Sequence, residues 1–359
     1  MNRQQKTQSN KIRRKSCCYI SAVLGFVLAF CLTFAICQRL VTPKYASGIT
    51  EGAFIREYYE EPSFDHDVIF LGDCEVYSSF VPAVLYRDFG INSYVRGSAQ
   101  QYIFQSYYVL RDTLYYETPK VVVLSVASLK YDKAQNEAYN RETIDGMRWS
   151  RAKVDCIRAS MTEGESFLSY VFPLLRFHSR ITSLSRDDFT WFWRNRMVTF
   201  SGYNMHCESS KTAEKRPVRP LADYRFKDRI MHDLEEIRIL CESRGIRLIL
   251  IKAPDSYPYW YPEYDEQVQI YAHTHNIPYL NFQKLAPLAG IDMQTETYDG
   301  GAHLNNAGAE KMSRYLGQYL RNTIGLADRR GEKDLAAEWK SKLAAYDAEK
   351  KRQQKEILP

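Results

Sequence analysis

The sequence predicts an α/β fold in which a parallel β-sheet is covered by helices on both faces. Short apolar runs alternate along the chain with longer segments of helical periodicity, which is the order of βαβ units. One of these runs, residues 121–126, is almost uninterrupted and β-branched, as expected of a central strand buried on both faces. The predicted strands are residues 67–71, 92–96, 121–126, 247–252 and 278–281. The predicted helices are residues 49–59, 80–89, 101–115, 225–244, 266–275 and 306–324.

The chain begins with the features of a membrane anchor. Residues 17–37 carry no charged side chain and are mostly apolar, and about 21 such residues form a helix of roughly 30 Å, enough to cross a bilayer. The preceding residues 1–16 are basic and contain no acid, so the positive-inside rule places the N-terminus in the cytoplasm. We therefore expect a cytoplasmic tail at 1–16 and a signal anchor at 17–38, with a cleaved signal peptide as the alternative.

Charge and cysteine content narrow the classes of function. The basic tail accounts for the whole net charge of +6, so the rest of the chain is not expected to bind nucleic acid. Half of the eight cysteines fall outside the anchor, too few for a disulfide framework in a chain of this length. Whether Cys156 and Cys207 pair stays open. CxxC and HExxH motifs are absent, so the sequence predicts no metal and no other cofactor.

Beyond the anchor, the alternation of strands and helices defines one large domain. Residues 39–66 are expected to connect the anchor to a domain at 67–326, which residues 133–222 interrupt as an aromatic-rich insertion. Because loops at the edge of such a sheet commonly form substrate walls, the insertion is either such a wall or a surface subdomain packed on its own aromatic side chains. Residues 327–359 are mostly charged or polar and predict a solvated helical tail.

The stretch from Asp67 to Ser78 carries the first candidate for chemistry. Apolar residues are followed by Gly72–Asp73, so a buried strand is expected to end there and a helix to begin near Cys74. A side chain at that point projects from the carboxyl edge of the sheet, where N–H groups of the new helix can face a developing anion. Cys74 is therefore a candidate nucleophile, and an inert buried cysteine is the alternative.

The glycine-rich loop before the last predicted helix carries the second candidate. Gly300–Gly301 form a flexible loop and an asparagine pair can cap the next helix, so His303 is expected at the same sheet edge as Cys74. Asp299 lies upstream in the same loop and can hydrogen-bond the imidazole, which fixes its tautomer. A nucleophile, an imidazole and an orienting carboxylate are the components of a catalytic triad.

Three motifs make the chain resemble the SGNH/GDSL hydrolase superfamily. Gly72–Asp73–Cys74 stands where that family has its first block, Gly-Asp-Ser or Gly-Ser-Ser. Asp299, His303–Leu304–Asn305 and Gly308–Ala309 resemble its last block, which carries the catalytic Asp and His. Residues 96–101, Arg-Gly-Ser-Ala-Gln-Gln, resemble the second block of a membrane-anchored bacterial branch. That branch is similar to accessory proteins of cell-surface polymer O-acylation, of the D-alanyl-lipoteichoic acid and alginate acetylation type.

The resemblance implies a three-layer α/β/α flavodoxin-like fold and a catalytic triad of Cys74, His303 and Asp299. It also implies an oxyanion site made by the backbone N–H groups of Cys74 and Gly97. Gln101 is expected to add a side-chain donor there, because the family's third-block Asn has no clean match. The chain departs from the family in having Cys for Ser and in stretching Asp-x-x-His to Asp-x-x-x-His. An activated thiolate should have a pKa below the free value of about 8.5.

The function implied by the resemblance is acyl-ester chemistry at a bacterial cell surface. The protein would be an O-acyltransferase or esterase that acts on a cell-surface polysaccharide or teichoic-acid-like polymer. Its main domain would be extracellular, and a multi-spanning membrane O-acyltransferase would be its partner. One alternative is a catalytically inactive surface protein of the same fold that binds glycan or scaffolds that acyltransferase. A second alternative is a thioesterase or a cysteine-dependent acyl carrier.

Overall fold

The computed structural model describes residues 3–43, 52–134, 136–190, 199–211, 218–256 and 259–357. They fall into two compact units, Met1–Ala46 with Ser166–Asn195 and Ser47–Glu165 with Arg196–Pro359. The first unit contains the predicted anchor, and the second contains the predicted strands and site residues. The start of the helix predicted near residue 49 lies outside the described residues, as do the aromatic residues 191–193 and most of the basic loop that follows residue 211.

The second unit is built on a five-stranded sheet in which all neighbouring strands are parallel, in the order β2-β1-β3-β4-β5. The strands are β1 Val68–Gly72, β2 Ser93–Gly97, β3 Val121–Ser125, β4 Arg247–Lys252 and β5 Tyr279–Asn281. The predicted strands are confirmed, each to within one residue at either end. The apolar and β-branched runs of the central strands β1 and β3 are buried on both faces, which is why the sequence marks them clearly.

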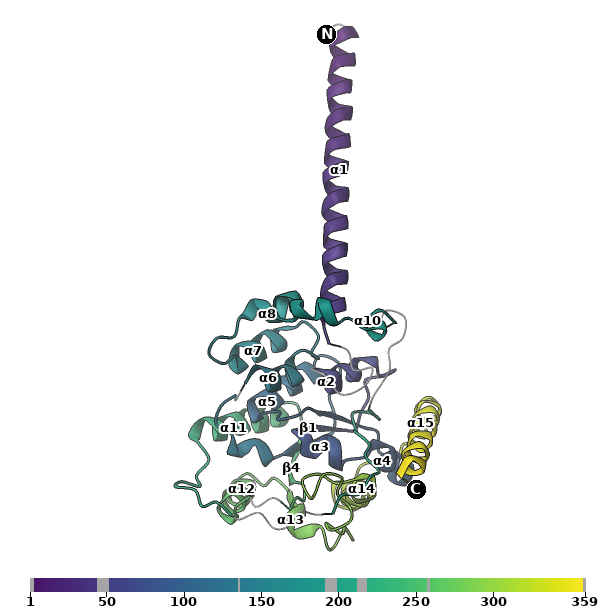
Figure 1. Ribbon diagram of the computed structural model, residues 1–359. Helices are drawn as coiled ribbons and strands as arrows, with labels where there is room; N and C mark the ends of the chain where they lie inside the picture. The colour runs from purple at the N-terminus through teal and green to yellow at the C-terminus, as the bar shows by residue number, and fades with distance from the viewer. Residues whose placement is uncertain are drawn as a thin grey trace. The chain divides into compact units, whose positions relative to one another are not determined.

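Helices cover both faces of the sheet, which confirms the predicted α/β fold. α5 and α11 pack together on one face, whereas α4 and α14 pack together on the other (Figure 1). Phe70 and Val123 lie in the core shared with α4 and α14, and the intervening strand residues face the opposite side. The helices of these layers are α3 Cys74–Ser79, α4 Pro82–Phe89, α5 Ile103–Thr113, α11 Asp228–Ser243, α12 Pro262–Thr274, α13 Phe282–Leu285 and α14 Asn306–Tyr319, with a π-helical turn at Leu320–Ile324.

The insertion predicted at 133–222 is divided between the two units, so it is not a single surface subdomain. Its first part forms α6 (Glu137–Ile144) and α7 (Arg151–Ser160), which pack against α2 (Ala53–Glu57) and α5 respectively. Its middle part belongs with the N-terminal helix. Its last part returns to the sheet-bearing unit, where the N–H of Asn204 donates to the carbonyl oxygen of Tyr77 on α3 (2.9 Å).

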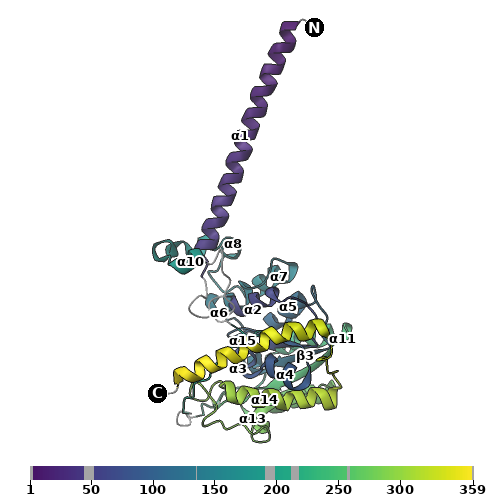
Figure 2. The same cartoon turned by 90° about the vertical axis from the view of Figure 1, so that its right-hand side faces the viewer.

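The C-terminal segment is not solvated along its whole length, which corrects the prediction for residues 327–359. α15 (Lys333–Ile357) buries Leu335, Trp339 and Tyr346 in the core, and it packs against α4 (Figure 2). These three residues are one and two helical turns apart and therefore form one narrow apolar stripe. The many charged residues between them hide this stripe in the sequence.

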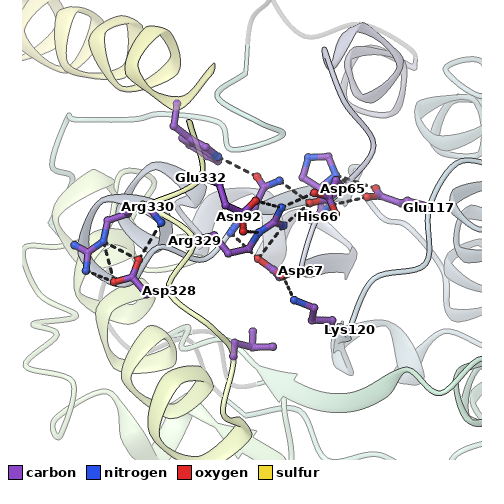
Figure 3. A network of polar contacts seen from close by, with 12 residues as sticks. Asp65, His66, Asp67, Asn92, Glu117, Lys120, Asp328, Arg329, Arg330 and Glu332 are labelled. Atoms are coloured by element: carbon purple, nitrogen blue, oxygen red, sulfur yellow. Dashed lines mark hydrogen bonds and ion pairs between the residues drawn. The ribbon is translucent and has the colours of Figure 1, made fainter. Parts of the chain in front are cut away.

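Polar contacts also tie the segment before α15 to the amino-terminal edge of the sheet (Figure 3). Arg329 donates to the carbonyl oxygen of Asp65 (2.9 Å) and pairs with Asp67 (3.5 Å), just before β1. Asn92 donates to the same carbonyl oxygen (2.8 Å), and Lys120 pairs with Asp67 (2.8 Å). Residues beyond 326 are therefore an integral part of the sheet-bearing unit.

Trp339→Ala is expected to lower the free energy of unfolding by about 3–5 kcal/mol. The Trp339 ring stacks on Tyr86, with centroids 4.7 Å apart and planes inclined by 8°, and its Nε1–H donates to Asn92 (3.0 Å). Chemical denaturation of the full-length protein in detergent measures the loss. Lys340→Ala on the exposed face of the same helix is the control and should change stability by no more than about 0.5 kcal/mol. Equal effects of the two substitutions would contradict the packing role of α15.

The first unit contains the N-terminal helix α1 (Arg3–Val41). Its portion Cys17–Val41, 25 residues that contain an 18-residue window of mean hydropathy 2.5, is long and apolar enough to cross a membrane. The anchor predicted at 17–38 lies within that portion. Among its described residues, this unit also contains the short helices α8 Phe167–Val171, α9 Pro173–Phe177, the 3₁₀ segment His178–Ser183 and α10 Arg186–Thr190.

Candidate active site

Cys74 is placed by the junction between β1 and α3. The apolar strand ends at Gly72, and Asp73 caps α3 by accepting a hydrogen bond from the N–H of Glu75 (3.2 Å). Cys74 is the first residue of the helix and is half-buried. The neighbouring strands are parallel, so Cys74 lies at the carboxyl edge of the sheet, as the sequence predicts.

His303 is placed by the loop that precedes α14. Asp299 Oδ2 lies 2.5 Å from His303 Nδ1, and Asp299 Oδ1 accepts hydrogen bonds from the N–H groups of Ala302 (3.1 Å) and His303 (2.9 Å). Gly300 and Gly301 have φ of +79° and +102°, which glycine adopts without a steric penalty. The two glycines thus accommodate the extra residue between Asp299 and His303.

The structure brings the three predicted catalytic side chains together. The side chains of Cys74 and His303 lie close enough to interact, since each shifts the pKa of the other. Because Nδ1 of His303 is engaged by Asp299, Nε2 is the ring nitrogen left for the Cys74 sulfur. Cys74, His303 and Asp299 therefore form one cluster, called the candidate triad below, with contributions from two loops that are far apart in the sequence.

The two backbone groups expected to bind an oxyanion lie at the same edge. Gly97 ends β2 and is paired with Gly72 at the end of β1. A Cβ atom on Gly97 would lie 2.3 Å from Cγ2 of Val76, so α3 can approach this closely only because residue 97 is glycine. The N–H of Cys74 is in the first turn of α3, where helix geometry supplies no acceptor.

Gln101 does not have the predicted role of side-chain oxyanion donor. Its Nε2 donates to the carbonyl oxygen of Arg96 (3.2 Å) and to Ser98 Oγ (3.4 Å). Its Oε1 accepts from the N–H of Gly72 (3.1 Å) and from Ser106 Oγ (2.8 Å), and the residue is fully buried. Gln101 instead joins the ends of β1 and β2. The sequence motif located this residue correctly, but it could not show which way the amide faces.

The pKa of the Cys74 thiol is raised above its usual value, so the prediction of a lowered pKa is wrong. Burial of the sulfur is the main cause and the nearby Asp73 carboxylate adds to it, whereas the hydrogen bond with His303 acts in the opposite direction. The sequence shows an imidazole and a helix N-terminus beside the thiol, but it gives no measure of how strongly the sulfur is desolvated.

The other two residues of the candidate triad, His303 and Asp299, carry opposite charges. Burial would lower the pKa of His303, but its hydrogen bonds to Asp299 and Cys74 raise it to about 12. Burial would raise the pKa of Asp299, but the hydrogen bond and charge of His303 hold it below its usual range. At neutral pH the site therefore holds a thiol, an imidazolium and a carboxylate.

A buried charge cluster that the sequence analysis missed lies beside the nucleophile. The ammonium group of Lys252, at the end of β4, contacts Glu75 Oε1 (2.6 Å), Asp255 Oδ2 (2.6 Å) and the carbonyl oxygen of Ala253 (2.7 Å). Burial raises the pKa of Glu75 to about 7 even though Lys252 acts against this shift. The only sign of this cluster in the sequence is a lysine at the end of an otherwise apolar strand.

This cluster connects the two loops of the site. Glu75 directly follows Cys74, and Asp255 precedes Ser256, whose N–H donates to the carbonyl oxygen of Gly301 (2.6 Å) in the His303 loop. Lys252 therefore holds the nucleophile helix and the loop after β4 together, and that loop in turn contacts the loop of the base.

Lys252→Met is expected to lower stability by about 3–5 kcal/mol, because it leaves the Glu75 and Asp255 carboxylates buried without their common partner. Any turnover should fall as well, by roughly 10²-fold, because the two loops of the site lose their shared support. Unfolding midpoints and initial rates measure the two effects. Lys120→Met removes a mostly exposed ammonium at the opposite edge, and its buried partner Asp67 keeps its contact with Arg329 (3.5 Å), so the cost should be no more than about 1–2 kcal/mol. Equal behaviour of the two variants would contradict the role given to Lys252.

Aromatic stacking also involves the His303 loop, and the sequence analysis missed this feature. The Tyr298 ring lies parallel to that of His303 at 5.7 Å and stacks on His206 at 3.9 Å. His206 comes from the last part of the insertion, and its carbonyl oxygen accepts from the N–H of Asn306 (2.6 Å) at the start of α14. Part of the insertion thus lies beside the site.

The remaining cysteines outside α1 are free thiols. Cys156 and Cys241 are buried and Cys207 is half-buried, so the pair considered between Cys156 and Cys207 is not formed. Among the described residues, no group of three or more His, Cys, Asp or Glu side chains could hold a metal ion. A cavity of about 650 Å³ lies between α15 and residues 199–205, and its lining includes none of Cys74, His303 and Asp299.

Comparisons with known proteins add little beyond the fold. No protein-family model matches the chain, and no curated protein is significantly similar to it in sequence. Among solved structures, it is similar to a lipolytic protein of the G-D-S-L family from Desulfitobacterium hafniense (14% identity, 71% of this chain and 99% of that chain, TM-score 0.37). It is also similar to a GDSL-like lipase from Bacteroides thetaiotaomicron (13% identity, 76% and 100%, TM-score 0.37). At these scores the argument for activity depends on the site's own geometry.

Proposed function

We propose that the protein is a membrane-anchored SGNH-like acyl-ester enzyme, an O-acyltransferase or esterase, in which Cys74 replaces the usual serine. The observation that carries this proposal is the candidate triad at the carboxyl edge of a parallel sheet, in which Asp299 is hydrogen-bonded to His303 and His303 interacts with Cys74. Such a cluster supplies a nucleophile, a proton carrier and an orienting carboxylate, the components that acyl transfer requires.

The first half of the reaction forms a thioester. The Cys74 thiolate attacks the acyl carbonyl carbon, and the backbone N–H groups of Cys74 and Gly97 stabilise the oxyanion. The ester C–O bond then breaks, and the His303 imidazolium gives its Nε2 proton to the departing alkoxide. In the second half, neutral His303 takes a proton from water or from an acceptor hydroxyl. The oxygen attacks the thioester, and the thiolate leaves.

A specific observation favours a second candidate, an inactive surface protein of the same fold that binds glycan or scaffolds a membrane acyltransferase. The raised pKa of Cys74 keeps the thiol protonated at neutral pH, and the raised pKa of His303 leaves it without a free lone pair to act as a base. A site that no longer catalyses ester cleavage does not need a low pKa at Cys74 or at His303. Activity measurements separate the two candidates.

The test uses the purified full-length protein in detergent with p-nitrophenyl acetate, in the presence and absence of a hydroxyl acceptor such as glycerol. The enzyme candidate predicts release of nitrophenolate that increases with pH, because the thiolate fraction increases. Acetylated acceptor in the products would identify a transferase, and free acetate alone an esterase. Turnover no faster than that of heat-denatured protein across pH 6–10 would favour the binding protein.

The anchor supports the class of substrate, and the resemblance to polymer-acylation accessory proteins implies the partner. A membrane helix holds the domain close to its source of substrate, which suits a cell-surface polysaccharide or teichoic-acid-like polymer made at a bacterial membrane. A multi-spanning membrane O-acyltransferase would supply the acyl group. The basic residues 1–16 support a cytoplasmic N-terminus and an extracellular main domain.

A protease added to intact cells is expected to degrade the protein beyond residue 45 and to spare the N-terminal tail. The reason is that the positive-inside rule places only residues 1–16 in the cytoplasm. Antibodies against tags at the two ends report the result on a blot. A C-terminal domain that stays protected in intact cells, but is degraded after lysis, would contradict the extracellular orientation.

A further inference from the structure

A segment far away in the sequence packs against the N-terminal helix. Residues 166–190, called the juxtamembrane segment below, belong to the same compact unit as α1 although more than 120 residues separate them from it in the chain. The segment consists of α8, α9, a 3₁₀ segment and α10, all of them short. Short helices are not stable by themselves, so the position of the segment depends on its contacts with other parts of the unit.

The contacts of the juxtamembrane segment are with the carboxyl-terminal turns of α1. Phe172 packs edge-on against Phe34, with ring centroids 5.9 Å apart. The N–H of Leu174 donates to Gln38 Oε1 (3.2 Å). Further along, Arg180 donates to the carbonyl oxygen of Val41 (2.8 Å) in the last turn of the helix. Residues in successive turns at the end of α1 are thus each contacted by a residue of the segment.

Those turns of α1 lie near a bilayer boundary. The apolar portion Cys17–Val41 has 25 residues, and at 1.5 Å per residue it spans about 38 Å, somewhat more than the roughly 30 Å hydrocarbon core. With the apolar portion centred in the bilayer, residues 34–41 fall at the outer part of the core and at the headgroup level. The segment that binds these residues lies at the same depth.

The side chains that the segment presents are those expected at that depth. Its large apolar residues that are more than half exposed are Leu168, Leu175, Ile181 and Phe189, and Phe172 is also partly exposed. In water, exposing these apolar side chains together would be unfavourable in free energy, because their surface stays hydrated. At the interface of a bilayer the same side chains enter the boundary between headgroups and acyl chains, as in helices that lie on a membrane.

We propose that the juxtamembrane segment binds the lipid interface of the leaflet in which α1 ends, with Leu168, Leu175, Ile181 and Phe189 inserted among the acyl chains. The occupant of this apolar surface is lipid because the segment adjoins the end of a membrane-crossing helix. The proposal does not depend on the activity of Cys74 or on which side of the membrane the domain occupies. It adds a second, peripheral membrane contact to the single-pass anchor.

Photocrosslinking of the full-length protein in phosphatidylcholine nanodiscs tests this proposal. Benzoylphenylalanine replaces Leu175 or Ile181 in the segment, and two matched exposed leucines serve as references. Leu28 in α1 is the lipid-facing reference, and Leu288 in the sheet-bearing unit is the water-facing one. After irradiation, mass spectrometry gives the yield of lipid adduct at each position.

The expected result is a lipid-adduct yield at residues 175 and 181 within about threefold of that at residue 28, and at least tenfold above that at residue 288. The use of two independent positions guards against a local distortion by either substitution. Yields at both positions no higher than at residue 288 would overturn the proposal. Crosslinks to a second copy of the chain in place of lipid would overturn it as well and would point to a protein interface.

Discussion

Cys74→Ala is expected to lower turnover of an activated acyl ester by about 10³-fold or more while the domain remains folded. The substitution removes the nucleophile, whereas the capping of α3 by Asp73 and the contacts of Glu75 with Lys252 do not involve the sulfur. Initial rates with p-nitrophenyl acetate, together with the unfolding midpoint, give both parts of the result. Cys207 is another half-buried cysteine and lies outside the candidate triad, so Cys207→Ala should keep the rate of the wild type.

The Cys74→Ser variant distinguishes an enzyme adapted to a thiol nucleophile from a site that has decayed from serine chemistry. An enzyme adapted to a thiol should lose most of its activity with the less acidic hydroxyl, whereas a site that has decayed from serine chemistry should gain activity. An unchanged rate in Cys74→Ala would remove Cys74 from the mechanism, whatever the serine variant does.

His303→Ala is expected to slow alkylation of Cys74 by iodoacetamide about tenfold at pH 7. The hydrogen bond and charge of His303 lower the pKa of the thiol, so their loss raises that pKa further and reduces the thiolate fraction. In the wild type, alkylation should accelerate about tenfold per pH unit between pH 7 and 9, because the thiol pKa lies above its usual value. Peptide mapping assigns the modified cysteine at each pH.

His232→Ala, an exposed histidine on α11, is the matched control and should leave the alkylation profile unchanged. A profile in which His303→Ala reacts as fast as the wild type at every pH would show that imidazole and thiol do not interact. Rapid alkylation of the wild type at pH 6 would contradict the raised thiol pKa.

The strands could be predicted because their signal is local. The clearest are β1 and β3, which are short, nearly unbroken apolar runs because burial on both faces leaves few positions for polar residues. α15 could not be predicted in the same way. Only Leu335, Trp339 and Tyr346 mark its apolar stripe among charged neighbours, so its packing becomes evident only with the surface that it covers.

In the candidate site too, some features could be predicted from local sequence and others could not. Cys74, Asp299 and His303 lie at junctions of strand, loop and helix, and such junctions can be recognised from glycine and capping residues. The direction of the Gln101 amide, the desolvation of the Cys74 sulfur and the contacts of Lys252 depend on side chains from distant parts of the chain. These features decide the chemistry of the site, and local pattern carries no information about them.

The most direct test of the central claim is the mass of the protein after brief exposure to an activated acetyl ester near pH 8. We expect one added acetyl group, mapped to the peptide that contains Cys74, removed by hydroxylamine, and absent from Cys74→Ala. A hydroxyl acceptor should shorten the lifetime of the adduct if the protein is a transferase. Ester turnover by the wild type with no acetyl group on Cys74, even after rapid quenching in acid, would contradict covalent catalysis by this residue.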